Sequence, residues 1–214
     1  MGSMRLRLPR AALGHHFGAV VAVLLLLATG CSQQAKLSPL VSDAVVLAFG
    51  DSLTYGTGAN EEESYPAHLA RITGRRVVRE GVPGEVSASG LDRLPAALDE
   101  HQPRLLILCH GGNDFLRRLP KEQAAENLRA MIRLAKDRGI EVLLIGTPEI
   151  GFTLTPPEFY AGIAKQFGIP YEGDVLTKIL RDGSLKSDQI HPNAQGYRLM
   201  AERVADLLRK SGAL

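Results

Sequence analysis

Short apolar runs alternate with longer amphipathic stretches from residue 45 to the C-terminus. The apolar runs are typical of strands that are buried on both faces, and they cover 45–49, 76–79, 105–109 and 142–145, with a short last strand expected after 168–171. The amphipathic stretches predict helices at 64–73, 87–100, 121–138, 157–167 and 193–210, where Pro95 could kink the second. Strands that alternate with helices predict the α/β class: a three-layer α/β/α sandwich around a central parallel sheet of about five strands.

The first thirty residues have the features of an export signal rather than of a folded domain. Arg5, Arg7 and Arg10 form a basic start, and the apolar segment 18–27 is too short for a comfortable membrane span. Residues 27–31, Leu-Ala-Thr-Gly-Cys, resemble the bacterial lipobox, in which the cysteine is lipidated. A plain secretory signal with an incidental cysteine is the alternative.

Three segments follow from this interpretation. We expect a lipoprotein-type signal peptide at 1–30, a polar tether at 31–43 and a single folded domain at 44–214. Lipidation of Cys31 would anchor the exported protein in a membrane, facing the periplasm or the cell exterior. The other cysteine, Cys109, lies in the apolar run 105–109, so we expect a buried free thiol rather than a disulfide partner.

The composition excludes some classes of partner. Without the three leader arginines, 22 basic side chains stand against 23 acidic ones, so the mature protein is close to neutral. A neutral chain without a basic patch does not favour binding of DNA or RNA. The absence of Trp and an aromatic content of 5% argue against a stacking surface for sugars or bases.

Candidate catalytic residues lie where parallel strands are expected to end. Ser52 follows the first strand, Gly84 the second and Asn113 the third, while Asp188 and His191 precede the last helix. Ligands of such sheets bind outside the carboxyl ends of the strands, so all five residues should share one edge. A serine needs a base such as histidine, and that base needs a carboxylate. Each residue alone has an ordinary explanation, such as a helix cap for Ser52 or a turn for Asn113.

Four sequence blocks carry a resemblance to a known family. They are Gly50-Asp51-Ser52-Leu53, residues 81–87 with Gly84, Gly111-Gly112-Asn113-Asp114, and residues 188–192 with His191. In this order they resemble the GDSL esterases and lipases of the SGNH-hydrolase branch, most of all the small periplasmic thioesterase, lysophospholipase and arylesterase group. The resemblance spans residues 45–208 and implies the flavodoxin-like SGNH-hydrolase fold, without a metal or an organic cofactor. Gly81 competes with Gly84 for the second block.

The resemblance implies a role for each residue. Ser52 would be the nucleophile, His191 the general base and then acid, and Asp188 the carboxylate that orients His191. Backbone N–H groups of Ser52 and Gly84 and the side-chain amide of Asn113 would form the oxyanion hole. Asp51 is a competing carboxylate, for which a structural hydrogen-bonding role is favoured. His110 lies next to the third block, and its role stays open.

The substrate is less well defined by the sequence. We expect a short-to-medium acyl ester or thioester, and aromatic and apolar residues in 152–160 could line an acyl pocket or belong to the core: Phe152, Leu154, Phe159 and Tyr160. The alternatives are a carbohydrate O-deacetylase acting on cell-wall or plant polysaccharide, and a lipoprotein that binds a ligand without catalysis.

Overall fold

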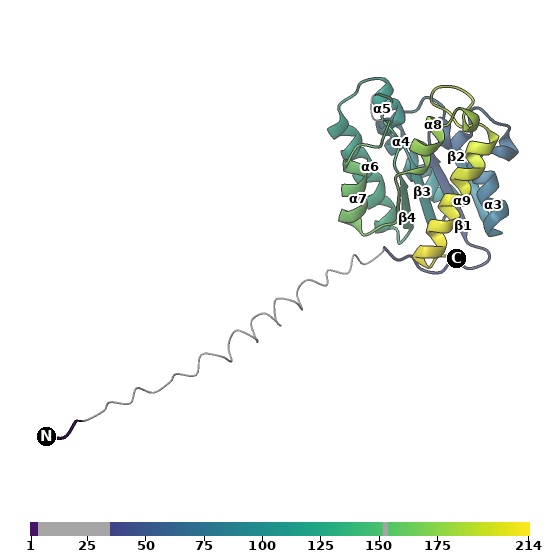
Figure 1. Ribbon diagram of the computed structural model, residues 1–214. Coiled ribbons are helices and arrows are strands. Elements are labelled where there is room, and N and C mark those ends of the chain that lie inside the picture. The colour runs from purple at the N-terminus through teal and green to yellow at the C-terminus, as the bar shows by residue number, and fades with distance from the viewer. Residues whose placement is uncertain (4–34, 152–153) are drawn as a thin grey trace. The chain divides into compact units, whose positions relative to one another are not determined.

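The computed structural model describes residues 1–3, 35–151 and 154–214 (Figure 1). Most of the expected signal peptide, the candidate lipidation site Cys31 and the pocket candidate Phe152 therefore lie outside the described residues. Within the described residues, no helix is both long and apolar enough to cross a membrane.

The sheet has the predicted class and strand number. Its five strands are β1 (Val45–Gly50), β2 (Arg76–Gly81), β3 (Leu105–Cys109), β4 (Glu141–Ile145) and β5 (Tyr171–Glu172). They pair in the order β2-β1-β3-β4-β5, and every pair is parallel. This is the flavodoxin-like order, in which the chain leaves β1 and β3 in opposite directions and opens a crevice between their carboxyl ends.

The helices form the two outer layers. They are α2 (Ser52–Tyr55), α3 (Tyr65–Thr73), α4 (Ser87–His101), α5 (Gly112–Leu116), α6 (Lys121–Asp137), α7 (Phe159–Phe167), α8 (Val175–Arg181) and α9 (Ala194–Ser211). The five long helices agree with the predicted ranges within two residues at each end. The sequence pattern did not predict α5 and α8, because one or two turns are too short to show a helical period.

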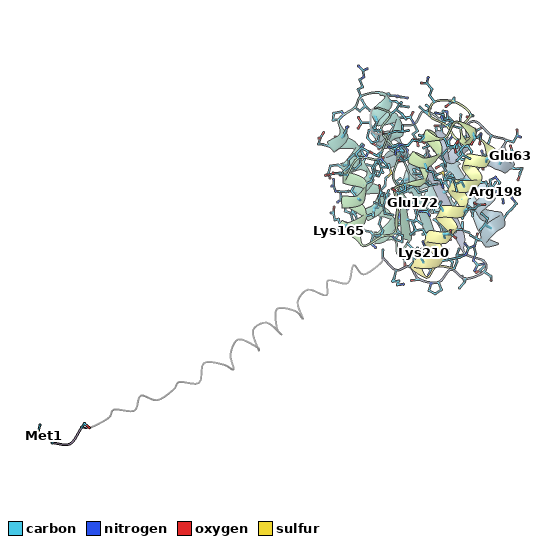
Figure 2. All side chains as sticks on the ribbon, viewed as in Figure 1. Met1, Glu63, Lys165, Glu172, Arg198 and Lys210 are labelled. Carbon is cyan, nitrogen blue, oxygen red and sulfur yellow. The ribbon has the colours of Figure 1, made fainter. Side chains whose placement is uncertain are left out.

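The core is divided by the sheet, as a three-layer sandwich requires. In β1, Val46 and Ala48 pack in the cluster that contains residues of α3, α8 and α9. The alternate residues Leu47 and Phe49 pack in the cluster of α4, α6 and α7. Charged side chains such as Lys165 of α7 and Arg198 and Lys210 of α9 lie on the outer surface (Figure 2). The predicted three-layer α/β fold is confirmed.

Part of the segment expected as a tether packs on the domain. Leu37 and Leu40 are buried, and their backbone N–H groups donate to the carbonyls of Ser211 and Ala213, both at 2.9 Å. The packed chain therefore starts several residues before residue 44. Cys109 is buried and free, as the sequence predicted.

Candidate active site

Ser52 is held at the first position of a single helical turn after β1. The carboxylate of Asp51 caps this turn by accepting a hydrogen bond from Leu53 N–H at 3.1 Å. Gly50 allows the close turn, because a Cβ there would overlap the carbonyl of Cys109 in the neighbouring strand. As the first residue of α2, Ser52 has a backbone N–H without an intrahelical acceptor, so this group is available to a ligand.

The loop before α9 brings His191 and Asp188 to Ser52. The Ser52 hydroxyl lies 3.0 Å from His191 Nε2, and His191 Nδ1 lies 2.7 Å from Asp188 Oδ2. The other carboxylate oxygen of Asp188 accepts from the backbone N–H groups of Ile190 and His191, each at 2.8 Å. The loop is closed by Ser187 N–H, which donates to the carbonyl of His191 at 2.9 Å. The three side chains therefore form one hydrogen-bonded line, and the backbone contacts of the loop hold Asp188 and His191 in position.

Electrostatics keep Asp188 charged. Its burial is slight and works to raise its pKa, but hydrogen bonds from His191 and from two backbone N–H groups outweigh this effect and lower the pKa below 3.8. A charged carboxylate on Nδ1 favours the tautomer with hydrogen on Nδ1 and a free Nε2 that faces the Ser52 hydroxyl. Asp188, and not Asp51, therefore makes the contact with His191.

Asp51 has a different set of partners. It is buried beside the nucleophile candidate, and burial raises its pKa above 3.8. Its Oδ2 accepts from Asn113 Nδ2 at 3.2 Å, in addition to the Leu53 bond of Oδ1. These contacts agree with the structural role expected for Asp51.

Asn113 reaches the same place from α5. Besides Asp51, its Nδ2 donates to the backbone carbonyl of Glu85 at 3.0 Å. Gly84 precedes Glu85 in a turn with φ +79°, a conformation that favours glycine, and Arg117 donates to its carbonyl at 2.7 Å. The competing Gly81 lies at the end of β2, where a Cβ would overlap the backbone N of Tyr55. Gly81 is therefore needed for packing against α2, whereas Gly84 lies next to the Asn113 contact.

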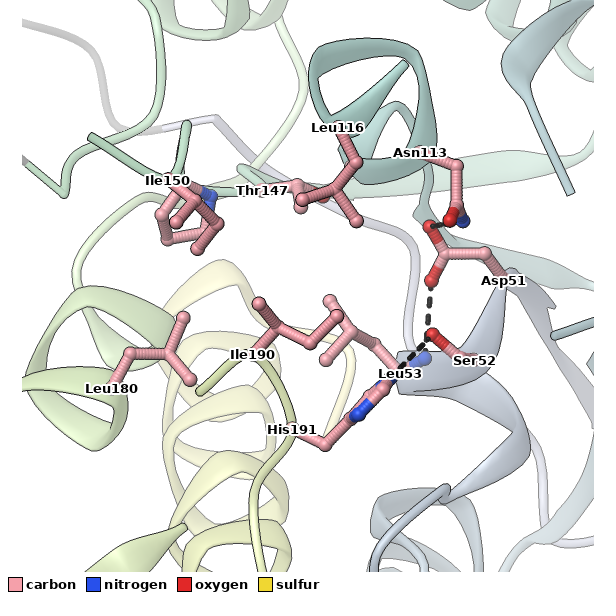
Figure 3. A pocket seen from close by; sticks show the side chains of 12 residues that line it. Asp51, Ser52, Leu53, Asn113, Leu116, Thr147, Ile150, Leu180, Ile190 and His191 are labelled. Atoms are coloured by element: carbon pink, nitrogen blue, oxygen red, sulfur yellow. Dashed lines mark hydrogen bonds between the residues drawn. The ribbon is translucent and has the colours of Figure 1, made fainter. Parts of the chain in front are cut away.

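A pocket opens beside these polar groups (Figure 3). Its empty volume is about 360 Å³, a figure that includes space open to solvent. Ser52, His191, Asp51 and Asn113 lie at one end, and the remaining wall is mostly apolar: Leu53, Gly112, Leu116, Thr147, Pro148, Ile150, Leu180 and Ile190. Gly84 is not among the lining residues. The site thus combines a polar end with an apolar cavity.

The aromatic residues considered for the pocket have other places. Tyr160 is fully buried in the core and Phe159 stacks on it, with ring centroids 4.6 Å apart. Leu154 does not line the pocket. The apolar wall comes instead from α5, the segment after β4, α8 and the loop at Ile190. Only the closeness of Leu116 to Asn113 and of Ile190 to His191 could have indicated it.

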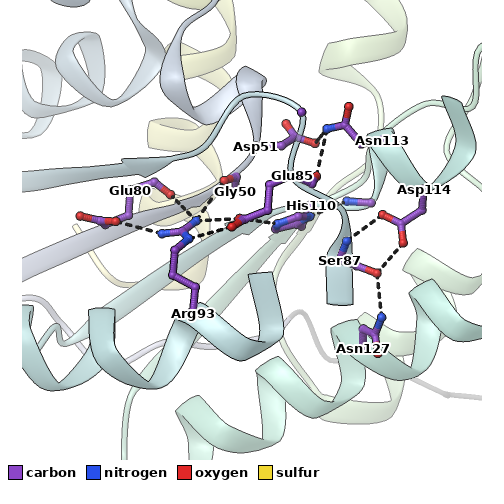
Figure 4. A network of polar contacts seen from close by, with 12 residues as sticks. Gly50, Asp51, Glu80, Glu85, Ser87, Arg93, His110, Asn113, Asp114 and Asn127 are labelled. Atoms are coloured by element: carbon purple, nitrogen blue, oxygen red, sulfur yellow. Dashed lines mark hydrogen bonds and ion pairs between the residues drawn. The ribbon is translucent and has the colours of Figure 1, made fainter. Parts of the chain in front are cut away.

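A polar network surrounds Glu85, the residue that follows Gly84 in the chain (Figure 4). Glu85 is bound by Arg93 through two contacts of 2.9 and 2.8 Å, and Arg93 also contacts Glu80 at 2.9 Å. Burial works to raise the pKa of Glu85, but hydrogen bonds from His110 and Arg93 lower it to about 2. The sequence did not single out Glu85 or Arg93.

Besides the bond from Asn113 Nδ2 to the Glu85 carbonyl, a second contact joins the segment after β2 to α5. Ser87 at the start of α4 donates its backbone N–H and its hydroxyl to the Asp114 carboxylate, at 2.8 and 2.6 Å. The segments that carry Gly84 and Asn113 are therefore linked by two sets of hydrogen bonds, one at Glu85 and one at Ser87. Among the described residues, no group of three or more His, Cys, Asp or Glu side chains could hold a metal ion.

Comparison with known proteins assigns this arrangement to a family. The model of the GDSL-like lipase/acylhydrolase family matches residues 48–199. Esterase TesA of Pseudomonas aeruginosa is 29% identical over 200 residues, which cover 86% of this chain and 97% of the relative. Thioesterase 1/protease 1/lysophospholipase L1 of Escherichia coli K12 is 31% identical over 172 residues, covering 77% and 83%. The crystal structure of AlinE4, an SGNH-hydrolase family esterase, has a TM-score of 0.60 at 30% identity. The match covers 79% of this chain and 96% of AlinE4.

The chain therefore belongs to the GDSL-like lipase/acylhydrolase family. The resemblance found in the four sequence blocks is confirmed, and so is the enzyme class, a carboxylic-ester hydrolase.

Proposed function

We propose that this protein is a serine esterase that hydrolyses short-to-medium acyl esters or thioesters through Ser52, His191 and Asp188. One observation carries the proposal: the hydrogen-bonded line from Asp188 through His191 ends at the Ser52 hydroxyl, and Ser52 and His191 line a mostly apolar pocket. A serine with such partners is an activated nucleophile, and an apolar cavity beside it suits an acyl chain. The relatives named as esterase and as thioesterase support this substrate class.

The proposed reaction has two halves. His191 Nε2 takes the proton of Ser52 as Oγ attacks the carbonyl carbon, and Asp188 stabilises the imidazolium that forms. The leaving alcohol or thiol takes that proton from His191, which leaves an acyl group on Ser52. Water then attacks the acyl-enzyme with His191 as base, and the acid is released with Ser52 restored.

The negative charge on the carbonyl oxygen needs donors. We assign this role to the backbone N–H groups of Ser52 and Gly84 and to Asn113 Nδ2. In the unliganded site, Asn113 Nδ2 donates to Asp51 and Glu85. The bond to Asp51 is the longer of the two, at 3.2 Å against 3.0 Å. In this mechanism that bond is exchanged for the oxyanion, while the Glu85 carbonyl keeps the amide in place.

The apolar wall favours an acyl group over a sugar ring. Leu116, Ile150, Leu180 and Ile190 offer no hydrogen bonds from their side chains to hydroxyl groups. Polysaccharide deacetylation is therefore the weaker alternative, and binding without catalysis leaves the Ser52–His191–Asp188 arrangement without a use.

Export and anchoring remain part of the proposal. The basic start, the apolar segment and the lipobox-like residues 27–31 support a signal peptide at 1–30 and lipidation of Cys31, followed by residues 31–43 and the hydrolase domain. Metabolic labelling with a clickable palmitate analogue should mark the wild-type protein and not Cys31→Ala. Equal labelling of both would contradict the anchor.

Hydrolysis of p-nitrophenyl esters from acetate to decanoate tests the function. We expect activity with an optimum at short-to-medium chain length and a loss of several orders of magnitude in Ser52→Ala. The matched control is Ser38→Ala, because the Ser38 hydroxyl donates to Glu141 at the amino end of β4, whereas the candidate site lies at the carboxyl ends of the strands. Near-normal hydrolysis by a folded Ser52→Ala variant would refute the nucleophile assignment.

A further inference from the structure

His110 is a fully buried imidazole at the end of β3, and the proposed mechanism does not use it. Its Nδ1 accepts a hydrogen bond from the backbone N–H of Gly111 at 3.1 Å, so Nδ1 carries no hydrogen. The hydrogen is therefore on Nε2, which lies 3.1 Å from Glu85 Oε2 and donates to that carboxylate (Figure 4). With both nitrogens engaged and 0% of the residue exposed, the ring is not a second catalytic base.

The two ends of the ring contact the two segments that carry the proposed oxyanion donors. Gly111 begins the turn that leads to Asn113. Glu85 directly follows Gly84, and the Glu85 carbonyl accepts from Asn113 Nδ2. The His110 imidazole thus connects the turn that carries Gly84 to the turn that carries Asn113.

The surroundings hold the ring in this one position. An added Cβ on Gly90 of α4 would overlap His110 Nε2, so the helix passes directly against the ring. The His110 carbonyl accepts from the Tyr160 hydroxyl at 2.7 Å. On the other side of the contact, Arg93 fixes the Glu85 carboxylate and lies over the Phe49 ring, 4.0 Å from its centroid.

We propose that His110 is a positioning residue, which sets the distance between the Gly84 and Asn113 donors by its hydrogen bond to Glu85. This inference rests on the proposed function, because it concerns the oxyanion hole of that mechanism. A misplacement of about 1 Å can lower the rate by about 100-fold. Loss of the His110–Glu85 hydrogen bond should therefore reduce transition-state stabilisation and leave substrate binding largely unchanged.

A set of substitutions at 110 separates this role from mere packing. His110→Leu removes both hydrogen bonds, and we expect kcat to fall by about 10- to 100-fold with KM within about threefold. His110→Gln and His110→Asn carry the same amide, but only the longer Gln reaches Glu85. We expect Gln to keep kcat within about threefold of wild type and Asn to lose about tenfold.

His101 supplies the matched control. Its Nε2 lies 3.2 Å from Glu80 Oε1 of the same network, whereas the hydrogen bonds of Glu85, Gly111 and Asn113 described above do not involve His101. His101→Leu should keep kcat within about twofold of wild type. Equal kcat for the Gln and Asn variants, or wild-type kcat in a folded Leu variant, would overturn the proposal. If His110→Leu does not fold, the Gln and Asn pair decides.

A second measurement does not depend on activity. The side-chain amide signals of Asn113 in ¹H–¹⁵N spectra should move in His110→Asn and remain in place in His101→Leu. Unmoved signals in His110→Asn overturn the positioning role even if the esterase assignment holds. Moved signals in an enzyme that hydrolyses no ester support the positioning role and contradict only the proposed function.

Discussion

The Asn113→Ala substitution tests the oxyanion assignment most sharply. It removes a donor whose two hydrogen bonds, of 3.2 Å to Asp51 and 3.0 Å to the Glu85 carbonyl, place the amide beside Ser52. Loss of one oxyanion donor lowers kcat by about 10²–10³, equivalent to about 3–4 kcal/mol. Because the interaction is made in the transition state and not with bound substrate, KM should stay within about threefold.

The same substitution has a separate effect on stability. A neutral hydrogen bond contributes roughly 1 kcal/mol and one to a charged group somewhat more, so the loss should be about 2–3 kcal/mol. For a domain of this size that corresponds to a decrease of about 5–10 °C in Tm. Asn60→Ala is a control for loss of an amide, since Asn60 Nδ2 donates to the exposed Glu63 carboxylate at 2.9 Å.

Steady-state kinetics with a p-nitrophenyl ester and thermal unfolding of the same samples separate the two effects. We expect Asn113→Ala to lose both kcat and stability and Asn60→Ala to keep kcat. A folded Asn113→Ala enzyme with lower Tm and unchanged kcat would mean that the amide is only structural, and the oxyanion assignment would be wrong.

Three further predictions concern other parts of the site. Asp188→Asn should lower kcat by about 10⁴, because the amide no longer fixes the Nδ1–H tautomer of His191, and kinetics that stay within tenfold of wild type would contradict this. The pKa of Glu85 is about 2 in the folded protein and ordinarily 4.5, so its contribution to stability is complete above pH 4.5 and is lost as the pH falls towards about 2. As the pH is lowered across that window, the Tm of Glu85→Gln should therefore decrease less than the Tm of wild type. Parallel curves of Tm against pH would contradict the low pKa of Glu85. Leu180→Trp should fill part of the pocket and shift the ester preference to shorter chains relative to the surface variant Lys165→Ala, and an unchanged preference would place the acyl chain elsewhere.

The fold was predictable because its signals are local and repeated. Buried parallel strands such as 105–109 are short continuous apolar runs, and α6 and α9 are long enough to show a helical period. The helices α5 and α8 lacked that signal, although they supply pocket residues Leu116 and Leu180.

The site was predictable only in part. Ser52, Asn113, Asp188 and His191 were predicted from the sequence blocks that resemble the family, and the expected strand ends placed Ser52 and Asn113 at one edge of the sheet. The structure brings these four side chains together. The apolar wall comes from segments far apart in sequence, whose members look like ordinary surface or core residues. The Glu85–His110 contact joins residues 25 positions apart, and no local pattern predicts it.

Labelling with a fluorophosphonate, followed by peptide mass spectrometry, tests the central claim most directly. We predict one adduct per molecule, located on Ser52, with loss of ester hydrolysis in proportion to labelling. His191→Ala should label far more slowly, because Ser52 then lacks its base. An adduct on another residue, or full hydrolysis by protein labelled at Ser52, would contradict the account.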